Sequence, residues 1–364
     1  MAVTNDLATD RRVLRHAETL REAGYEVVLL GRNEVPTRYN RGWRFYLEFN
    51  IGLRRKLREL KSDVVWANDT DTLLGCYWGV KSYELRVMSY ESGVRRSRLV
   101  LDCHELFPEV PEIQHKPFVK WVWRTIEKHL MPKCDALLTV CQSIADHYKE
   151  KYGVKMTVVR NLPSGKRKVE SGNIDDVGGH LSTLLYQGKV NLGRGVDWAI
   201  DAMEFLPDCR LVVAGDGDLL EQMKAYAEQK PWKGRIVFTG RLKPEELERL
   251  TPQADVGLVM LEDLGLSYHY ALPNRIGDFV QAGVPMVVSD LPEMATVVRK
   301  FGVGEVIECR PQAVDRKAKV AGLTEAVKKV LEKGRGGYDF TAAREDMDWN
   351  KEKKKLIGLL SCEL

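Results

Sequence analysis

Short apolar runs alternate with amphipathic stretches along nearly the whole chain. Runs of this length, rich in β-branched residues, are typical of strands buried on both faces of a parallel sheet. In the first half they predict strands over residues 2–4, 25–30, 63–67, 99–102 and 136–140. In the second half they predict strands over residues 183–187, 210–214, 236–238, 256–259 and 286–288. Strands and helices that alternate in this way predict two doubly wound, Rossmann-like α/β domains.

Helices are predicted where apolar residues recur at intervals of three and four. In the first half the clearest lie over residues 11–23 and 118–131, and Thr9 or Asp10 is expected to cap the earlier one. Ser143 is expected to cap a further helix after residues 136–140, which we interpret as the last strand of the first sheet. In the second half helices are predicted near residues 194–204, 217–228, 244–251, 274–281 and 314–332.

A chain of 364 residues is too long for one ordinary core and fits two domains. Residues 164–180 are polar and glycine-rich without apolar periodicity, which predicts a linker. We therefore expect an N-terminal domain over residues 1–163 and a C-terminal domain over residues 181–345. A closing helix over residues 346–364 is expected to complete the N-terminal domain.

Composition indicates a soluble globular protein, with 44% hydrophobic and 30% charged residues. No apolar run reaches the roughly 20 residues needed to span a bilayer, and the sequence opens with no basic and apolar signal region. The 7 cysteines are scattered without a C-x-x-C pair, which indicates free thiols in a reducing compartment. We therefore expect a cytoplasmic protein.

Positive charge is concentrated in the first half of the chain. Residues 1–160 hold 27 Lys and Arg against 21 Asp and Glu, and the remainder holds 29 against 31. Within this half, residues 38–60 interleave aromatic rings with cationic side chains. Such a segment suits a peripheral contact with an anionic membrane surface, or else a strand with buried aromatics followed by a helix with a solvated basic face. Only the basic half favours nucleic acid, so no nucleic-acid partner is expected.

Residues 268–294, YHYALPNRIGDFVQAGVPMVVSDLPEM, predict a loop, a helix, a strand and a second loop. Pro273 suits the first turn of the helix and Gly283 its C-terminal end. A helix N-terminus presents free N–H groups to anions, and open α/β sheets bind ligands beyond the carboxyl ends of their strands. This segment is therefore a candidate ligand site.

The same segment, with ANDTDTL and HELFPEVPE earlier in the chain, resembles glycosyltransferase family 4. The resemblance implies the GT-B fold, in which two Rossmann-like domains face a cleft and a C-terminal helix crosses back to the first. It also implies a retaining, metal-independent transfer from a UDP- or GDP-sugar, without a cofactor. The implied acceptor is a glycan or a lipid-linked molecule, as in cell-surface polysaccharide synthesis, at the inner face of the cytoplasmic membrane.

The family signature contains two glutamates separated by seven residues. Asp278 occupies the position of the second glutamate, where a carboxylate would hydrogen-bond ribose hydroxyls. Tyr270 occupies the position of the first, so the group that holds the donor sugar is open. Tyr270, its neighbour His269 or the backbone N–H groups of residues 271–274 are the candidates. The expected donor-binding residues of this segment are His269, Tyr270, Leu272, Pro273, Asn274 and Asp278.

A glycine-containing loop with two cations follows the first predicted strand of the second half. Small residues let the backbone approach a pyrophosphate, and the cations offset its charge. Lys189 and Arg194 occupy the positions at which the family binds the donor diphosphate with an Arg and a Lys, with the two types exchanged. The resemblance assigns further donor contacts to Gly188, Gly215, Asp216, Gly217, Arg241 and Leu242.

In the first half, His104 follows a predicted strand and matches the H-E loop of the family. A histidine at this position can donate to a sugar hydroxyl or support a leaving phosphate. With Lys189 and Arg194 it forms the expected catalytic set. Polar residues of the first and third loops are expected to line the same cleft and contact acceptor or donor: Asn5, Asp6, Asp10, Asn68 and Asp69.

No metal site is expected, because no His or Cys residues cluster at ligand spacing. Asp69-Thr70-Asp71 matches the D-x-D motif of metal-dependent transferases, but its position before a predicted helix is explained by a helix cap. Two other functions remain open. A GT-B epimerase acting on the nucleotide sugar would need acid and base carboxylates and no acceptor. A catalytically inactive protein that binds a nucleotide or a glycan is favoured by the departure at Tyr270.

Overall fold

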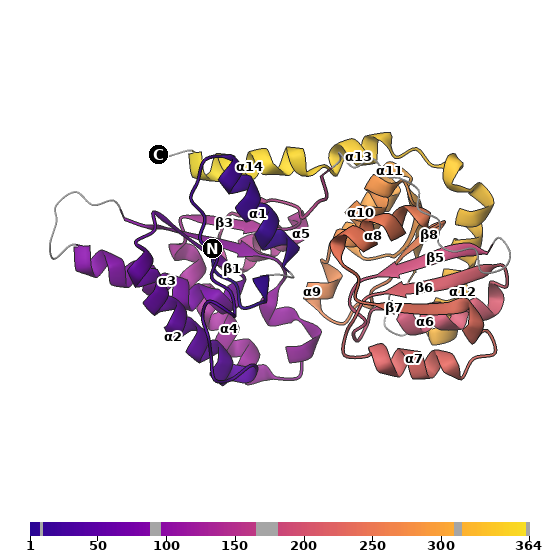
Figure 1. Cartoon of the computed structure of the whole chain (residues 1–364), viewed down its shortest axis with the longest axis horizontal. Helices are drawn as coiled ribbons and strands as arrows, with labels where there is room; N and C mark the ends of the chain where they lie inside the picture. The colour runs from indigo at the N-terminus through magenta and orange to yellow at the C-terminus, as the bar shows by residue number, and fades with distance from the viewer. Residues whose placement is uncertain (8–9, 88–95, 165–180, 309–314, 362–364) are drawn as a thin grey trace. The chain divides into compact units, whose positions relative to one another are not determined.

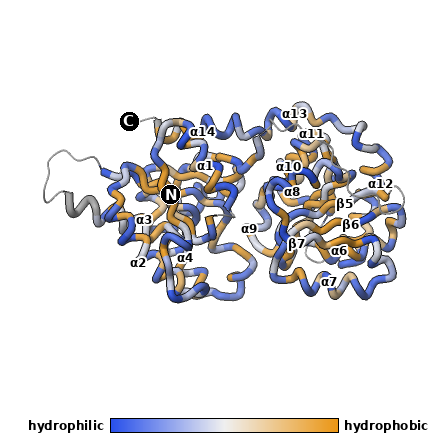
Figure 2. The backbone as a smooth tube through the Cα atoms, viewed as in Figure 1, coloured by the Kyte–Doolittle hydropathy of each residue, from blue (hydrophilic) through white to orange (hydrophobic). Residues whose placement is uncertain are grey.

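The computed structural model describes residues 1–364 except 8–9, 88–95, 165–180, 309–314 and 362–364. The chain divides into two compact units, each built around its own parallel sheet (Figure 1). Unit 1 comprises Met1–Asn161 and Glu352–Leu364, and unit 2 comprises Leu162–Lys351. Nearly all of the predicted linker lies outside the described residues. In Figure 2 the central strands of each unit are mostly hydrophobic, whereas the outer helices alternate hydrophilic and hydrophobic segments.

Among the described residues, the sheet of unit 1 has four parallel strands in the order β1-β2-β3-β4. The strands are β1 Val64–Asn68, β2 Arg98–Cys103, β3 Ala136–Thr139 and β4 Thr157–Val158. Parallel bridges extend the sheet beyond β1, because Ala2 pairs with Ala67 on one side and with Leu30 on the other. The order of chain segments therefore reverses between Ala2 and β1. Doubly wound sheets bind ligands at such a reversal, beyond the carboxyl ends of the strands.

The helices of unit 1 are α1 Arg11–Glu22, α2 Gly42–Leu60, α3 Thr70–Val87, α4 Pro117–Leu130 and α5 Gln142–Tyr152. Short 3₁₀ turns over Phe107–Glu109, Pro111–Ile113 and Met131–Lys133 flank α4. The closing helix, α14 Trp349–Ser361, enters unit 1 at Glu352. Glu352 is fully buried and accepts hydrogen bonds from the backbone and guanidinium of Arg160. This ion pair fixes the end of the chain to the first sheet, as the GT-B expectation requires.

Four predictions for unit 1 need correction. The second strand, expected over residues 25–30, is reduced to the bridge at Leu30. The strand expected before the helix in residues 38–60 is wrong, since α2 begins at Gly42 and its apolar residues recur every four positions. The cap of α5 is Cys141 rather than Ser143, and β4 follows β3 in the sheet. The Asp10 cap of α1 is confirmed, because its side chain accepts a hydrogen bond from the N–H of Val13.

In the part of unit 2 that the structure describes, the sheet has six parallel strands in the order β10-β9-β8-β5-β6-β7. The strands are β5 Ser182–Gln187, β6 Cys209–Ala214, β7 Ile236–Gly240, β8 Val256–Val259, β9 Met286–Ser289 and β10 Gly304–Ile307. This is the order of a dinucleotide-binding fold, with its reversal between β5 and β8. The sequence did not predict β10, because its residues Gly-Glu-Val-Ile form no continuous apolar run.

Helices cover both faces of the second sheet (Figure 1). They are α6 Val196–Ala202, α7 Leu220–Glu228, α8 Pro244–Leu250, α9 Leu266–His269, α10 Asn274–Ala282, α11 Pro292–Phe301, α12 Arg316–Lys333 and α13 Thr341–Asp346. Of these, α9, α11 and α13 were not predicted. The expected helix over residues 274–281 is confirmed as α10, with Pro273 at its N-cap and Gly283 at its C-cap. The two parallel α/β sheets agree with the expected fold class.

Candidate functional site

Two glycine-containing loops face each other at the carboxyl ends of β5 and β6 in unit 2. The N–H of Gly188 donates to the carbonyl of Ala214 at 2.9 Å, and the N–H of Val190 donates to the carbonyl of Asp216 at 2.8 Å. A Cβ atom on Gly215 would lie 1.8 Å from the carbonyl oxygen of Gly188, so no larger residue fits there. Glycine therefore lets the two loops pack backbone against backbone, and it leaves their outer side open to a ligand.

Asp216 brings two predicted donor residues together. Its Oδ1 accepts a hydrogen bond from Nζ of Lys189 at 2.9 Å, and its Oδ2 lies 3.9 Å from Nη1 of Arg241. The hydrogen bond from Lys189 is the main cause that lowers the pKa of Asp216. The Lys189 side chain is 59% exposed, so its ammonium group is held in place but remains open to an incoming anion.

Arg194 is fixed by Tyr268, a residue that the sequence analysis did not single out. Its Nε donates to the Tyr268 hydroxyl at 3.1 Å, and its guanidinium carbon lies 4.6 Å from the centre of the tyrosine ring. The Tyr268 ring is buried. A cation stacked on a buried ring loses little conformational freedom when it binds an anion, which suits the predicted role at the diphosphate.

Arg275, in the first turn of α10, is the clearest site residue that the sequence analysis missed. Its side chain is buried, stacks 4.7 Å above the Tyr186 ring and donates from Nη1 to the carbonyl of Gln187 at 2.8 Å. Its Nε and Nη2 are buried without a hydrogen-bond partner. Burial lowers the pKa of Arg275, and the charge of Arg194 contributes to the lowering. Buried donors are nearly always partnered, so this guanidinium is placed for an anion.

The two signature positions have different surroundings. Asp278 accepts a hydrogen bond from Nε2 of Gln187 at 3.0 Å, and Oε1 of Gln187 accepts one from Thr251 at 2.9 Å. The Asp278 carboxylate is therefore fixed to the end of β5. Tyr270 ends α9, and its ring makes an edge contact with His269, whose Nδ1 lies 2.9 Å from Asp263.

The remaining predicted donor residues lie on loops and helix starts of unit 2. Leu272 and Pro273 are half-buried before α10, Asn274 is exposed at its first position, and Leu242 is half-buried after β7. The backbone of Gly217 approaches Asn191, since a Cβ atom on Gly217 would lie 2.4 Å from Oδ1 of Asn191.

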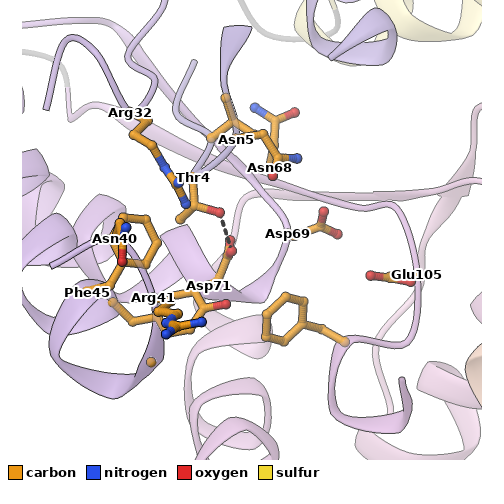
Figure 3. A pocket seen from close by; sticks show the side chains of 14 residues that line it. Thr4, Asn5, Arg32, Asn40, Arg41, Phe45, Asn68, Asp69, Asp71 and Glu105 are labelled. Carbon is orange, nitrogen blue, oxygen red and sulfur yellow. Dashed lines mark hydrogen bonds between the residues drawn. The ribbon is translucent and has the colours of Figure 1, made fainter. Parts of the chain in front are cut away.

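Unit 1 contains a cavity of about 270 Å³ at the reversal between Ala2 and β1 (Figure 3). Three of the predicted acceptor or cleft residues line it: Asn5, Asn68 and Asp69. Asp6 and Asp10 do not, and Asp10 instead caps α1 and accepts a hydrogen bond from Asn5. The lining also includes residues that the sequence analysis did not assign to a site: Val3, Thr4, Arg32, Asn40, Arg41, Gly42, Phe45, Tyr46, Asp71, Glu105 and Phe107.

Asp71 is the most buried carboxylate of this cavity. Its Oδ2 accepts a hydrogen bond from the Thr4 hydroxyl at 2.5 Å, whereas its Oδ1 has no partner. Burial raises the pKa of Asp71 to about 8, and the nearby charge of Asp69 adds to the rise. Oδ1 of Asn68 is likewise buried without a partner. The cavity therefore offers hydrogen-bonding groups that the protein itself does not satisfy.

His104 lies between two carboxylates beside this cavity. Its Nδ1 is 3.2 Å from Asp69, its Nε2 is 3.5 Å from Asp102, and its backbone N–H donates to Asp69 at 2.7 Å. Burial alone would lower the pKa of His104, but the charges of Asp69 and Asp102 outweigh it and raise the pKa to about 9. The structure thus holds a histidine cation at the carboxyl end of β2.

Asp102 connects His104 to a second cation, Arg12. The Arg12 guanidinium donates to both oxygens of Asp102, at 2.9 and 2.6 Å, and also to the carbonyl of Val159. Arg12 and Asp102 are both buried. Burial would raise the pKa of Asp102, but Arg12 and His104 hold it well below its usual value. The ionised Asp102 therefore orients His104 from the side opposite Asp69.

Two further properties concern the part of the chain that the structure describes. No group of three or more His, Cys, Asp or Glu side chains is placed there to hold a metal ion, and the expectation of metal-independent chemistry stays a prediction. Of the helices in that part, none is both long enough and apolar enough to cross a membrane.

Comparison with solved structures supports the fold. A lipopolysaccharide outer core galactosyltransferase in its apo form aligns with a TM-score of 0.63 at 13% identity, over 100% of this chain and 98% of its own. Sucrose-phosphate synthase from Thermosynechococcus elongatus aligns with a TM-score of 0.71 at 14% identity, over 96% and 92%. A trehalose-6-phosphate protein from E. coli, bound with UDP-2-fluoro glucose, aligns with a TM-score of 0.63 at 15% identity, over 98% and 84%.

Sequence comparisons identify the family. A curated relative, an uncharacterized glycosyltransferase of Methanocaldococcus jannaschii, is 25% identical over 121 residues, which span 32% of this chain and 29% of that relative. Residues 9–163 match the model of Glycosyltransferase Family 4, and residues 182–333 match the model of Glycosyl transferases group 1. Between them the two models cover both α/β units, and the chain belongs to the group 1 glycosyltransferases of family 4.

Proposed function

We propose that this protein is an active, retaining glycosyltransferase that moves a sugar from a UDP- or GDP-sugar to a glycan or lipid-linked acceptor. The observation that carries the proposal is the set of cations around the glycine loops of unit 2. This set consists of Lys189, Arg194, Arg241 and Arg275. The first of these glycine loops follows β5, and the order of the strands reverses between β5 and β8. Dinucleotide-binding sheets receive their ligands at such a reversal.

In this proposal the cations bind the diphosphate of the donor. Negative charge develops on the diphosphate as the bond to the sugar breaks, and preorganised donors stabilise that charge. Lys189 and Arg194 should therefore matter more to turnover than to binding of the donor. His104, held protonated by Asp69 and Asp102, is assigned to a sugar hydroxyl or to the leaving phosphate. Asp278 is assigned to the ribose, and no metal ion is required.

The test is release of nucleotide from a panel of UDP- and GDP-sugars, without added metal, by the wild type and by Lys189→Ala. UDP-sugars come first, because the aligned E. coli protein is bound with UDP-2-fluoro glucose. A matched control is Lys233→Ala, since Lys233 also forms an exposed 2.9 Å ion pair, with Glu228, but lies before β7 and away from the glycine loops.

Release of one nucleotide that Lys189→Ala loses and Lys233→Ala keeps would support the proposal. Conversion of the sugar without release of nucleotide would instead indicate an epimerase. If no nucleotide is released and no nucleotide raises the melting temperature, the protein does not have this activity. A ligand that binds the native state must stabilise it, so the lack of stabilisation would mean that no nucleotide binds.

The acceptor part of the proposal is supported by an exposed surface on α2 and α4, here called the α2–α4 surface. It comprises Trp43, Leu47 and Ile51 on α2 and Phe118 and Trp121 on α4. The first three recur every four residues and so follow one face of α2, and the rings of Phe118 and Trp121 stack at 5.9 Å. Trp43, Phe118 and Trp121 are 70%, 72% and 60% exposed.

Cations border this surface on α2: Arg44, Arg54, Arg55, Lys56 and Arg58 are all exposed. The two helices meet through an edge contact of 5.2 Å between Tyr46 and Trp123. Large exposed apolar side chains with a basic border are typical of proteins that lie on an anionic membrane. We propose that unit 1 lies on the inner face of the cytoplasmic membrane, where it meets a membrane-held acceptor.

Sedimentation with vesicles of phosphatidylglycerol and phosphatidylcholine at low salt tests this part. Trp43→Ser with Trp121→Ser should abolish sedimentation, whereas Phe205→Ser, which removes a ring that is 51% exposed from unit 2, should not. Wild-type protein that stays in the supernatant at low salt would contradict the membrane proposal.

A further inference from the structure

The cavity of unit 1 has a positive side, formed by the start of α2 and the loop after Leu30. Arg32, Arg41 and Gly42 line it there. Arg41 is the N-cap of α2, makes no capping hydrogen bond with its side chain, and is followed by no acidic residue in the first turn. The first N–H groups of this 19-residue helix therefore have no side-chain acceptor in their own turn, and their dipole adds to the charge of the two arginines.

The other side of the cavity is formed by acceptors. Asp69 and Glu105 lie across the cavity from Arg32 and Arg41, with Asp71 between the two groups (Figure 3). Asp71 is 5% exposed and its Oδ1 has no partner, so the protein keeps a buried polar atom unsatisfied at the cavity wall. Buried polar atoms without partners are rare, and a ligand hydroxyl would satisfy this one.

Aromatic rings form a further part of the cavity wall. Phe45, Tyr46 and Phe107 line it, and Tyr46 is held by edge contacts with Phe107 at 6.5 Å and Trp123 at 5.2 Å. Pockets for drug-sized ligands have volumes of roughly 300–1,000 Å³. A volume of about 270 Å³ lies just below that range and fits a small polar ligand such as one sugar ring.

We propose that this cavity binds one sugar residue of the acceptor and selects a sugar that carries a negatively charged group, either a carboxylate or a phosphate ester. The sugar hydroxyls bind Asp69 and Asp71, and the charged group binds Arg32, Arg41 and the start of α2. A neutral sugar would leave the arginines and the helix end unused. An anion without hydroxyls would leave Asp71 unsatisfied and would meet two further carboxylates.

This inference rests on the proposed transferase function, because the cavity is treated as the acceptor side of that reaction. Its test measures binding alone, so it does not depend on turnover. Ligand-observed NMR titrations of the full chain compare glucuronate and galacturonate, the corresponding sugar 1-phosphates, and neutral glucose and galactose. Each titration is run with and without UDP and GDP. A sugar phosphate that binds the nucleotide site of unit 2 would be displaced by the nucleotide, whereas one that binds the cavity of unit 1 would not.

Two variants report on the two sides of the cavity. Arg41→Gln should weaken the charged sugars at least tenfold and leave the neutral sugars unchanged. Asp71→Ala, which removes both side-chain oxygens, should weaken every sugar that binds, and it should leave nucleotide binding intact. Arg55→Gln is the matched control, because it removes one exposed cation from the same helix without touching the cavity lining. A single cooperative thermal transition for each protein would show that the three variants are folded.

Binding of a charged sugar that Arg41→Gln loses and Arg55→Gln keeps would support the inference. Tighter binding of the uronates or of the sugar phosphates would then show whether the charged group of the acceptor sugar is a carboxylate or a phosphate ester. Equal binding of neutral and charged sugars, or binding that neither cavity variant changes, would overturn it. If no sugar binds while UDP or GDP still does, the inference fails and the proposed function stands. If nucleotides fail as well, the proposed function falls independently.

Discussion

The two candidate sites both lie at the carboxyl ends of parallel strands but are built in different ways. In unit 2 the site is made by backbone: glycines bring two loops together at β5 and β6, and cations border them. In unit 1 the site is made by side chains: carboxylates and aromatic rings line the cavity, and the lining residues come from segments as far apart as Thr4 and Phe107. Each glycine loop of unit 2 is a short motif in the sequence, whereas the cavity of unit 1 depends on side chains from the whole unit.

This difference has an energetic consequence. Exposed ion pairs such as Lys189–Asp216 contribute roughly 0–1 kcal/mol, so the loops of unit 2 can lose function without losing the fold. Buried ion pairs are different, because removal of one partner leaves an uncompensated charge inside the protein. Unit 1 contains such a pair, Arg12–Asp102, directly beside His104.

The largest effect is therefore expected for Asp102→Asn. Arg12 would stay buried without its counter-charge, and the free energy of unfolding of unit 1 should fall by about 3–5 kcal/mol. A urea titration followed by circular dichroism measures the loss. Asp63→Asn, on an exposed residue just before β1, is the control and should change stability by no more than about 0.5 kcal/mol. Equal midpoints for the two variants would show that the buried pair does not hold unit 1 together.

The corresponding change in unit 2 is Arg275→Met, which keeps an unbranched apolar stem and removes the guanidinium with its charge. Arg275 has two unpartnered donors next to the glycine loops, so its loss should reduce turnover of the donor about 10²–10³-fold, as removal of one preorganised donor does elsewhere. Steady-state kinetics of nucleotide release measures the effect.

Arg235→Met distinguishes a role at the site from a role in folding. Arg235 also binds backbone carbonyls from a partly buried position, those of Met203, Leu206 and Cys209, but it lies at the opposite end of the sheet, before β7. Both variants should lose stability, and only Arg275→Met should lose turnover. If the two lose turnover equally, Arg275 is a structural residue.

The sequence predicted the architecture well, because buried parallel strands and their loops have local signatures. Eight of the ten named strands lie in predicted ranges, and the exceptions have physical causes. The strand β4 has only two residues, and the four residues of β10 include a glutamate. The strand expected before α2 is wrong. The spacing of four between the aromatic residues at positions 45 and 49 fits both the two-residue repeat of a strand and the turn of a helix, and only the apolar residues further along α2 show that the segment is a helix.

The placement of the two glycine loops of unit 2 was predictable for the same reason. Gly188, Lys189, Gly215 and Asp216 belong to short motifs after predicted strands, and the structure brings Lys189 and Asp216 into contact. Arg275 was within the recognised segment, but its position depends on Gln187, which lies 88 residues earlier. In unit 1 the sequence explained Asp71 as part of a helix cap, whereas its hydrogen-bond partner Thr4 lies 67 residues away. Contacts over such separations leave no local pattern.

A smaller effect, on the pH dependence of stability, is expected for Asp71→Asn. The folded protein raises the pKa of Asp71 from 3.8 to about 8, so between these values the folded state holds a proton that the unfolded state releases. Stability therefore falls as the pH rises from about 4 to about 8 and is unaffected by this group outside that window. Each pKa unit corresponds to about 1.4 kcal/mol, so even part of the shift is measurable.

Urea titrations of the wild type and Asp71→Asn at pH 5, 6, 7 and 8 test this prediction. His104 adds a similar fall, because its pKa is raised from 6.5 to about 9, and both proteins share that contribution. Asp69, whose pKa burial also raises, is present in both proteins, and its charge is one cause of the raised pKa of Asp71. The difference between the two proteins should grow steadily from pH 5 to pH 8 in favour of the variant. Parallel curves would mean that Asp71 is ionised in the folded state.

The smallest effect is expected at Tyr270, where unit 2 departs from the family signature. Tyr270→Phe removes one hydroxyl and keeps the ring that contacts His269. If the hydroxyl binds the donor sugar, its loss should weaken donor binding by about 0.5–1.5 kcal/mol, roughly 2- to 13-fold in the dissociation constant. Affinity for the bare nucleotide should stay the same, because only the sugar is involved. Unchanged affinity for both would exclude the side chain and leave the backbone N–H groups of residues 271–274 as the sugar contact, so that unit 2 would rely on backbone here as it does at its glycine loops.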